Sequence, residues 1–222
     1  MHHQYHSPVS ERLGLAFVHI PKNAGTAVVE ALGLSPHGHC KASSPEFRRT
    51  LAALGARISP RRPRAFAFVR DPYDRFLSAF RYLRMKRSHW HSDDGSTAYG
   101  LLPEHAIVGA MRGVDEFADW VMALFVSGRV DSAHHVSRQV SYTHDPRDGH
   151  ATRLVGEVYR LEDGVGTALA ALLGSDGDAG AVPVLNASSG AGGWVHTRRS
   201  REVVETVYRA DFEAFGYPMR QG

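Results

Sequence analysis

The chain has 222 residues, of which 43% are hydrophobic and 22% are charged, and its formal net charge is +3 at pH 7. This length and composition predict one α/β domain over residues 1–222 with a full-sized core, and they exclude wholesale disorder. The small positive charge suits an anionic ligand and is too weak to indicate nucleic acid as a partner. We expect residues 1–12 to form a mobile tail and residues from about 86 to 130 to be a helical and loop insertion.

The sequence carries no sign of export or of membrane insertion. Its single cysteine, Cys40, cannot form an internal disulfide, so nothing indicates an oxidising compartment. The apolar runs are far shorter than the roughly 20 residues that span a bilayer. The N-terminus also lacks the apolar segment of a signal peptide. We therefore expect a cytoplasmic protein with no membrane partner.

The first predicted elements are a strand, a tight loop and a helix. Residues 15–20 (LAFVHI) form a compact, β-prone run that stops at Pro21. Residues 26–32 then read as a helix, with Gly33 as its C-terminal stop.

The same order returns further along the chain. Residues 65–69 (AFAFV) predict a second strand, which ends at Arg70. Asp71 and Pro72 are favourable residues at a helix start, and the apolar spacing that follows predicts a helix with one buried face.

The remaining elements continue the alternation of strands and helices. We expect polar loops over residues 86–100 and 174–193, a strand over 157–161, and helices over 45–54, 114–126, 163–173 and 199–215. This pattern predicts a three-layer α/β fold like that of the P-loop NTPases, with a mostly parallel sheet flanked by helices. Ligands of such sheets bind beyond the carboxyl ends of the strands, where residues 21–26 and Arg70 would lie.

The loop before the first predicted helix has the chemistry of an anion site. Free N–H groups at a helix start form a cradle for an anion, Gly25 allows close backbone approach, and Thr26 offers a hydroxyl. Lys22 adds a positive charge. A Walker A loop would place lysine directly before Ser or Thr, which this loop does not.

Two segments resemble the carbohydrate-type sulfotransferases. FVHIPKNAGT is similar to their 5′-phosphosulfate-binding loop, HIPKTGGTS, and departs from it at Asn23, Ala24 and Ala27. FAFVRDPYDRFLSAF is similar to their 3′-phosphate-binding segment, R-D-P-x-x-R-x-x-S, which implies that Arg70 and Ser78 hold the 3′-phosphate.

Two weaker resemblances lie nearer the C-terminus. Residues 135–142 (HVSRQVSY) resemble H-x-x-P-Q-x-x-Y of the same family, with Arg138 in place of proline. PVLNAS resembles the family's P-x-x-N-x-S loop and implies that Asn186 and Ser188 lie near the cofactor.

The resemblance implies an enzyme that uses 3′-phosphoadenosine 5′-phosphosulfate (PAPS) as donor and releases adenosine 3′,5′-bisphosphate. The acceptor would be a hydroxyl group, and the family suggests a glycan. No metal is expected, because Lys22 and helix N–H groups can stabilise the leaving phosphate. The residues expected to bind the donor are Pro21, Lys22, Asn23, Ala24, Gly25, Thr26, Arg70, Ser78, Asn186 and Ser188.

The general base is expected to be a histidine, whose ordinary pKa lies near neutrality. His39 matches the family's G-H-x-x-x-S element and is our first choice, and His135 is the second. His37, Glu30 and Glu162 remain alternatives, whereas His19 is interpreted as a core histidine.

Two other functions remain open from the sequence. A P-loop nucleotide or small-molecule kinase would share the architecture, but it would carry a GK[ST] loop and an acidic metal ligand after the second strand, where Arg70 stands. A non-catalytic module that binds a bisphosphate or a glycan would keep Lys22, Arg70 and Ser78 without turnover.

Overall fold

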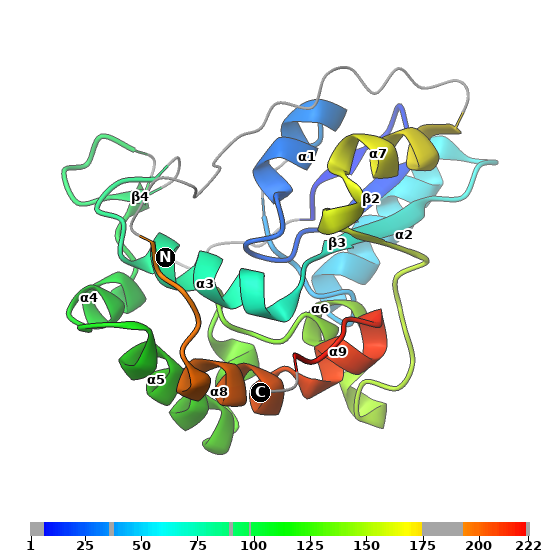
Figure 1. The fold of residues 1–222 in the computed structure, drawn as a ribbon. Helices are drawn as coiled ribbons and strands as arrows, with labels where there is room; N and C mark the ends of the chain where they lie inside the picture. The colour runs from blue at the N-terminus through cyan, green and yellow to red at the C-terminus, as the bar shows by residue number, and fades with distance from the viewer. Residues whose placement is uncertain (1–6, 36–37, 89–90, 98, 175–192, 221–222) are drawn as a thin grey trace. The chain divides into compact units, whose positions relative to one another are not determined.

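The computed structural model describes residues 7–35, 38–88, 91–97, 99–174 and 193–220 (Figure 1). The contacts divide the chain into two compact units. The first comprises Met1–Asp71 and Gln139–Leu185, and the second comprises Pro72–Arg138 and Asn186–Gly222. That the whole chain forms one domain stays a prediction.

The first unit is built on a four-stranded sheet with the order β1-β2-β3-β6. Only β1 is antiparallel to its neighbour; β2, β3 and β6 run parallel. This mostly parallel sheet flanked by helices confirms the predicted α/β fold. The strands are β1 (Val9–Ser10), β2 (Leu15–Val18), β3 (Arg64–Val69) and β6 (Glu157–Arg160).

Apolar side chains on one face of this sheet form the core of the first unit. Phe17 of β2 stacks on Phe66 of β3 with ring centroids 4.9 Å apart. Helices α1 and α7 cover these rings with buried aliphatic side chains such as Val28 and Leu169 (Figure 1). The helices of the unit are α1 (Gly25–Leu32), α2 (Pro45–Ile58), α6 (Val140–Thr143) and α7 (Val165–Leu173), with 3₁₀ turns η2 (Pro146–Asp148) and η3 (Leu161–Asp163).

The parallel strands bring their carboxyl ends to one edge of the sheet. Val18 ends β2 and pairs with Ala67, so β3 continues two residues further, to Val69. Val69 pairs in turn with Arg160, the last residue of β6. The segments that follow these strands therefore leave from the same edge, where α/β proteins bind ligands.

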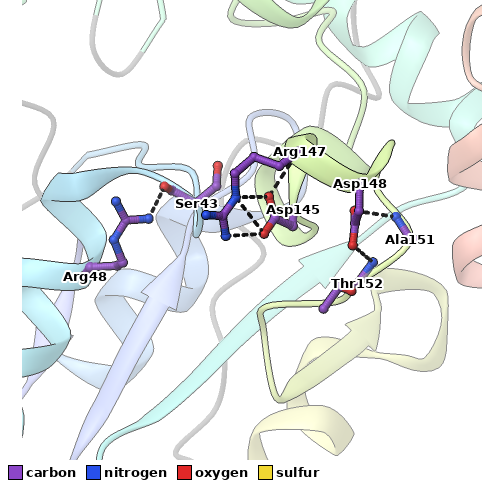
Figure 2. Close-up of polar contacts among 7 residues, drawn as sticks. All are labelled: Ser43, Arg48, Asp145, Arg147, Asp148, Ala151 and Thr152. Atoms are coloured by element: carbon purple, nitrogen blue, oxygen red, sulfur yellow. Dashed lines mark hydrogen bonds and ion pairs between the residues drawn. The ribbon is translucent and has the colours of Figure 1, made fainter.

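The segment after α6 is fixed by two aspartates (Figure 2). The Arg147 side chain and backbone N–H bond to the Asp145 carboxylate and lower its pKa to about 2. Asp148 accepts the backbone N–H groups of Ala151 and Thr152 at 2.9 and 3.0 Å. These contacts define the path of the chain from α6 to β6.

The second unit consists mainly of helices. Its core contains aromatic side chains, with Phe76 of α3 and Phe117 of α5 at 4.8 Å between ring centroids. Helix α5 packs against α8. The elements are α3 (Pro72–Leu83), α4 (Pro103–Gly109), α5 (Val114–Val126), α8 (Arg198–Val207), α9 (Arg209–Phe215), the 3₁₀ turn η1 (Val130–Ser132) and the short strands β4 (His91–Ser92) and β5 (Tyr99–Gly100).

The structure corrects several predicted elements. The C-terminal helix expected over residues 199–215 is two helices, α8 and α9, separated at Tyr208. Tyr208 is buried, and its hydroxyl donates to the carbonyl oxygen of Val136 at 2.7 Å. The first strand ends at Val18 rather than at residue 20, and α4 lies in the predicted helical and loop insertion, for which no such helix bounds were given.

No helix in the described ranges is long and apolar enough to cross a bilayer.

Candidate active site

The loop between β2 and α1 has an unusual backbone. Lys22 and Ala24 adopt left-handed conformations, with φ of 71° and 55°. A residue with a Cβ pays roughly 1–2 kcal/mol for this conformation. Such strain is concentrated at functional sites, and alternating backbone hands turn successive N–H groups toward a common point.

The start of α1 also lacks a capping side chain. Ala24 occupies the N-cap and provides no side-chain hydrogen bond to the helix. Alanine is among the poor residues at this position, and the first N–H groups of any helix have no intrahelical acceptor. An anion at this helix end would supply the missing acceptor.

Gly25 is required because His19 lies against it. A Cβ at position 25 would lie 1.7 Å from Nε2 of His19. The His19 ring is buried and stacks on Phe17 at 5.3 Å between centroids. His19 is thus packed in the core, as expected, and its ring also packs against the loop at Gly25.

His39 lies beside the same loop. Its ring centroid is 3.8 Å from that of His19, and its Nδ1 is 2.9 Å from the His19 carbonyl oxygen. Because a carbonyl oxygen only accepts, this contact requires the proton on Nδ1. The neutral ring then presents Nε2 as its basic nitrogen. A neutral imidazole with an unprotonated nitrogen can act as a general base.

Cys40, next to His39 in sequence, is a poor nucleophile. Its side chain is buried, and burial raises the pKa of the thiol. The reactive thiolate form is therefore disfavoured at neutral pH.

Arg70 is held to the first unit through its backbone. The side-chain amide of Gln139 accepts the Arg70 N–H at 2.9 Å and donates to the Arg70 carbonyl oxygen at 2.8 Å. The Arg70 guanidinium lies 3.5 Å from the carbonyl oxygen of Lys22, at the limit of a hydrogen bond. The structure thus brings Arg70 to the Lys22 loop.

Asn23 connects this loop to the sheet. Its Nδ2 donates to the carbonyl oxygen of Phe68 in β3 and to Oε1 of Gln139, both at 2.8 Å. Both amide hydrogens are used inside the protein, so a ligand would meet the backbone of Asn23 rather than its side-chain NH₂. Sequence reasoning gave no role to Gln139, although the H-x-x-R-Q-x-x-Y resemblance contained it.

Glu162 has a supporting position. Its Oε1 accepts the backbone N–H of Asp71 at 2.8 Å, just before α3. This contact connects the end of β6 to the end of β3. The contact is consistent with a role in the fold rather than in proton transfer.

Two other candidate residues, Ser78 and His135, belong to the second unit. Ser78 is buried on α3 beside Arg75, which donates to the carbonyl oxygen of Ser137 at 2.8 Å. His135 is buried with its ring 4.8 Å from that of Tyr82. The Tyr82 hydroxyl lies 2.7 Å from Nδ1 of His91, so His135 stands in an aromatic cluster rich in histidine.

Asn186, Ser188 and His37 lie outside the described residues, so their predicted roles stay predictions. The described part of the chain contains no group of three or more His, Cys, Asp or Glu side chains arranged to hold a metal ion.

A comparison with known protein families gives one match. Residues 5–100 match the model of the sulfotransferase family. Over these residues the chain is similar to that family, which is a family of enzymes. The match contains the Lys22 loop, His39 and the Arg70 segment, and it covers less than half of the 222 residues. No curated protein and no solved structure is significantly similar to the chain.

Proposed function

We propose that this protein transfers the sulfonyl group of PAPS to a hydroxyl group of an acceptor. The observation that carries the proposal is the loop at α1. It combines two left-handed residues, Lys22 and Ala24, with a helix start that no side chain caps. The family match over the same residues supports a sulfonate-transferring enzyme rather than another phosphate-binding one.

The donor would be held at two points. The backbone N–H groups of residues 22–26, with the Thr26 hydroxyl and the Lys22 ammonium, suit the 5′-phosphosulfate. The Arg70 guanidinium suits the 3′-phosphate, because a planar guanidinium bonds a phosphate in a bidentate manner. The acceptor class that the family suggests is a glycan hydroxyl.

The reaction needs a base, an electrophile and a stabilised leaving group. The acceptor oxygen forms a new bond to sulfur while the bond from sulfur to the bridging phosphate oxygen breaks. The hydroxyl proton passes to Nε2 of His39, and the electron pair leaves on adenosine 3′,5′-bisphosphate. Lys22 offsets the negative charge that develops on the departing phosphate.

His39 is favoured over His135 by its surroundings. The contact from Nδ1 to the His19 carbonyl oxygen places the proton on Nδ1 and leaves Nε2 as the basic nitrogen. His39 also belongs to the same unit as the Lys22 loop, whereas His135 lies in the buried aromatic cluster with Tyr82.

The test is donor turnover. The protein is incubated with PAPS labelled in its sulfur and a panel of glycans, phenols and aliphatic alcohols, with release of the bisphosphate measured in parallel. Label transfer that depends on Lys22 supports the proposal. Transfer of the γ-phosphoryl group of ATP·Mg to the same panel, without label transfer from PAPS, would overturn it in favour of a kinase.

A further inference from the structure

We propose that Gln139 is a positioning residue that holds Arg70 and the Lys22 loop in a fixed relation, acting through Asn23. This inference rests on the proposed function, because it assigns the two ends of the donor site to a single buried network. Gln139 itself would not touch the donor.

The network consists of side-chain amides that mimic a strand partner. Gln139 bonds both the N–H and the C=O of Arg70, at 2.9 and 2.8 Å, as a neighbouring residue in an antiparallel pair would. The same Oε1 accepts Nδ2 of Asn23 at 2.8 Å. One amide therefore connects the residue after β3 to the loop after β2.

Burial makes this connection rigid. Gln139 has 0% and Asn23 has 1% of its surface exposed, so water does not compete for their hydrogen bonds. Asn23 also donates to the carbonyl oxygen of Phe68, beyond the last residue pair between β2 and β3. The amides thus continue the sheet where β2 has ended.

The network depends on a residue that departs from the family pattern. Asn23 stands where the resembling loops carry threonine. A threonine hydroxyl has one hydrogen and could not donate to Phe68 and Gln139 together. A change of Asn23 to threonine would therefore remove at least one of these two hydrogen bonds.

The effect should appear in ligand selectivity rather than in folding alone. Adenosine 3′,5′-bisphosphate needs both the loop and Arg70, whereas 5′-AMP lacks the 3′-phosphate and needs the loop only. If Gln139 sets the relation between the loop and Arg70, its loss lowers the affinity for the bisphosphate more than the affinity for 5′-AMP. If Gln139 only stabilises the fold, its loss lowers both affinities equally.

The experiment measures both affinities by calorimetry for the wild type, Gln139→Glu and Asn23→Thr. Glutamate has the same shape but cannot donate to the Arg70 carbonyl oxygen. Each change should reduce the preference for the bisphosphate by about tenfold, the usual size of coupling between contacting residues. In the Arg70→Ala background, Gln139→Glu should change the preference little further.

Asp148→Ala is the matched control, because it removes two hydrogen bonds from the same stretch of chain, away from the loop. It should lower stability to urea and leave the preference unchanged. If Gln139→Glu fails to fold, Asn23→Thr decides alone. An unchanged preference in the folded variants would overturn the positioning role, whereas no preference in the wild type would instead overturn the proposed function.

Discussion

The imidazole Nδ1 of His39 lies 2.9 Å from the carbonyl oxygen of His19, although the two residues are 20 positions apart. The rings also meet, with centroids 3.8 Å apart. This pair fixes the orientation of His39 beside the loop that begins at Pro21. Orientation and tautomer are what distinguish a general base from a histidine that merely lies nearby.

The proposed role of His39 as general base leads to a prediction for His39→Asn. Asparagine Nδ2 can still donate to the His19 carbonyl oxygen, so the fold and the affinity for adenosine 3′,5′-bisphosphate should be retained. Turnover should fall roughly a hundredfold to ten-thousandfold, the usual contribution of general base catalysis. Steady-state rates and calorimetry measure the two effects separately. His135→Asn is the comparison, and a larger rate loss there than in His39→Asn would move the base to His135.

Lys22→Met tests stabilisation of the leaving phosphate. Methionine keeps the length of the side chain and removes its charge. We expect kcat to fall by about a hundredfold or more, with a smaller change in KM, because the charge on the leaving group develops only in the transition state. Lys22→Arg should recover part of the rate. Near-normal turnover in Lys22→Met would contradict this role.

Ala24→Gly tests the strain at the helix start. Ala24 has φ of 55°, and glycine reaches this region without the steric cost of a Cβ. Allowing for the greater freedom of glycine in the unfolded chain, we expect a gain of about 0.5–1 kcal/mol in the free energy of unfolding. Ala31→Gly, at an exposed position within the same helix, is the control and should lose about 1 kcal/mol. Urea denaturation measures both, and a loss in both variants would contradict the strain.

His196 predicts a loss of stability in mild acid. Desolvation lowers its pKa, and the nearby Arg220 and Arg201 act in the same direction, against the Tyr73 carbonyl and Asp74. The neutral form is therefore favoured in the folded state. Its contribution is complete above the ordinary pKa of about 6.5 and is lost as the pH falls below it, because the unfolded chain binds the proton first.

The measurement for His196 is the midpoint of urea unfolding between pH 7.5 and pH 5, in the wild type and in His196→Gln. Glutamine can still donate to the Tyr73 carbonyl oxygen, which lies 2.9 Å from Nε2 of the histidine, but it does not titrate. Its midpoint should fall less with pH than that of the wild type. Equal slopes would show that His196 does not titrate differently in the two states.

The local sequence pattern predicted a helix correctly where tertiary packing agreed with it. The helix predicted over residues 114–126 has those bounds, because its apolar face and the glycine before it act over short distances. The predicted helix over 199–215 is interrupted at Tyr208, a buried residue whose hydroxyl donates to the distant Val136 carbonyl oxygen, a contact that helical periodicity does not reveal. Helix α4 lies in the stretch over 86–130 that was predicted as a helical and loop insertion, without bounds for a helix at this place.

One part of the candidate site could likewise be predicted from the sequence, and another part could not. The Lys22 loop and Arg70 could be found in the sequence, because each follows a strand directly. The link between them could not, since Asn23 and Gln139 are 116 residues apart and meet only through the parallel sheet. The resemblance over residues 135–142 included Gln139, but it did not indicate that Gln139 bonds Asn23 and Arg70.

The central claim is that the Lys22 loop and Arg70 form a site for PAPS. Calorimetric titration with adenosine 3′,5′-bisphosphate, 5′-AMP and ATP·Mg tests it most directly, on the wild type and on Arg70→Ala. We predict a strong preference of the wild type for the bisphosphate, which the substitution abolishes. Binding of ATP·Mg as tight as that of the bisphosphate, unaffected by Arg70→Ala, would contradict the claim and indicate an ordinary nucleotide site.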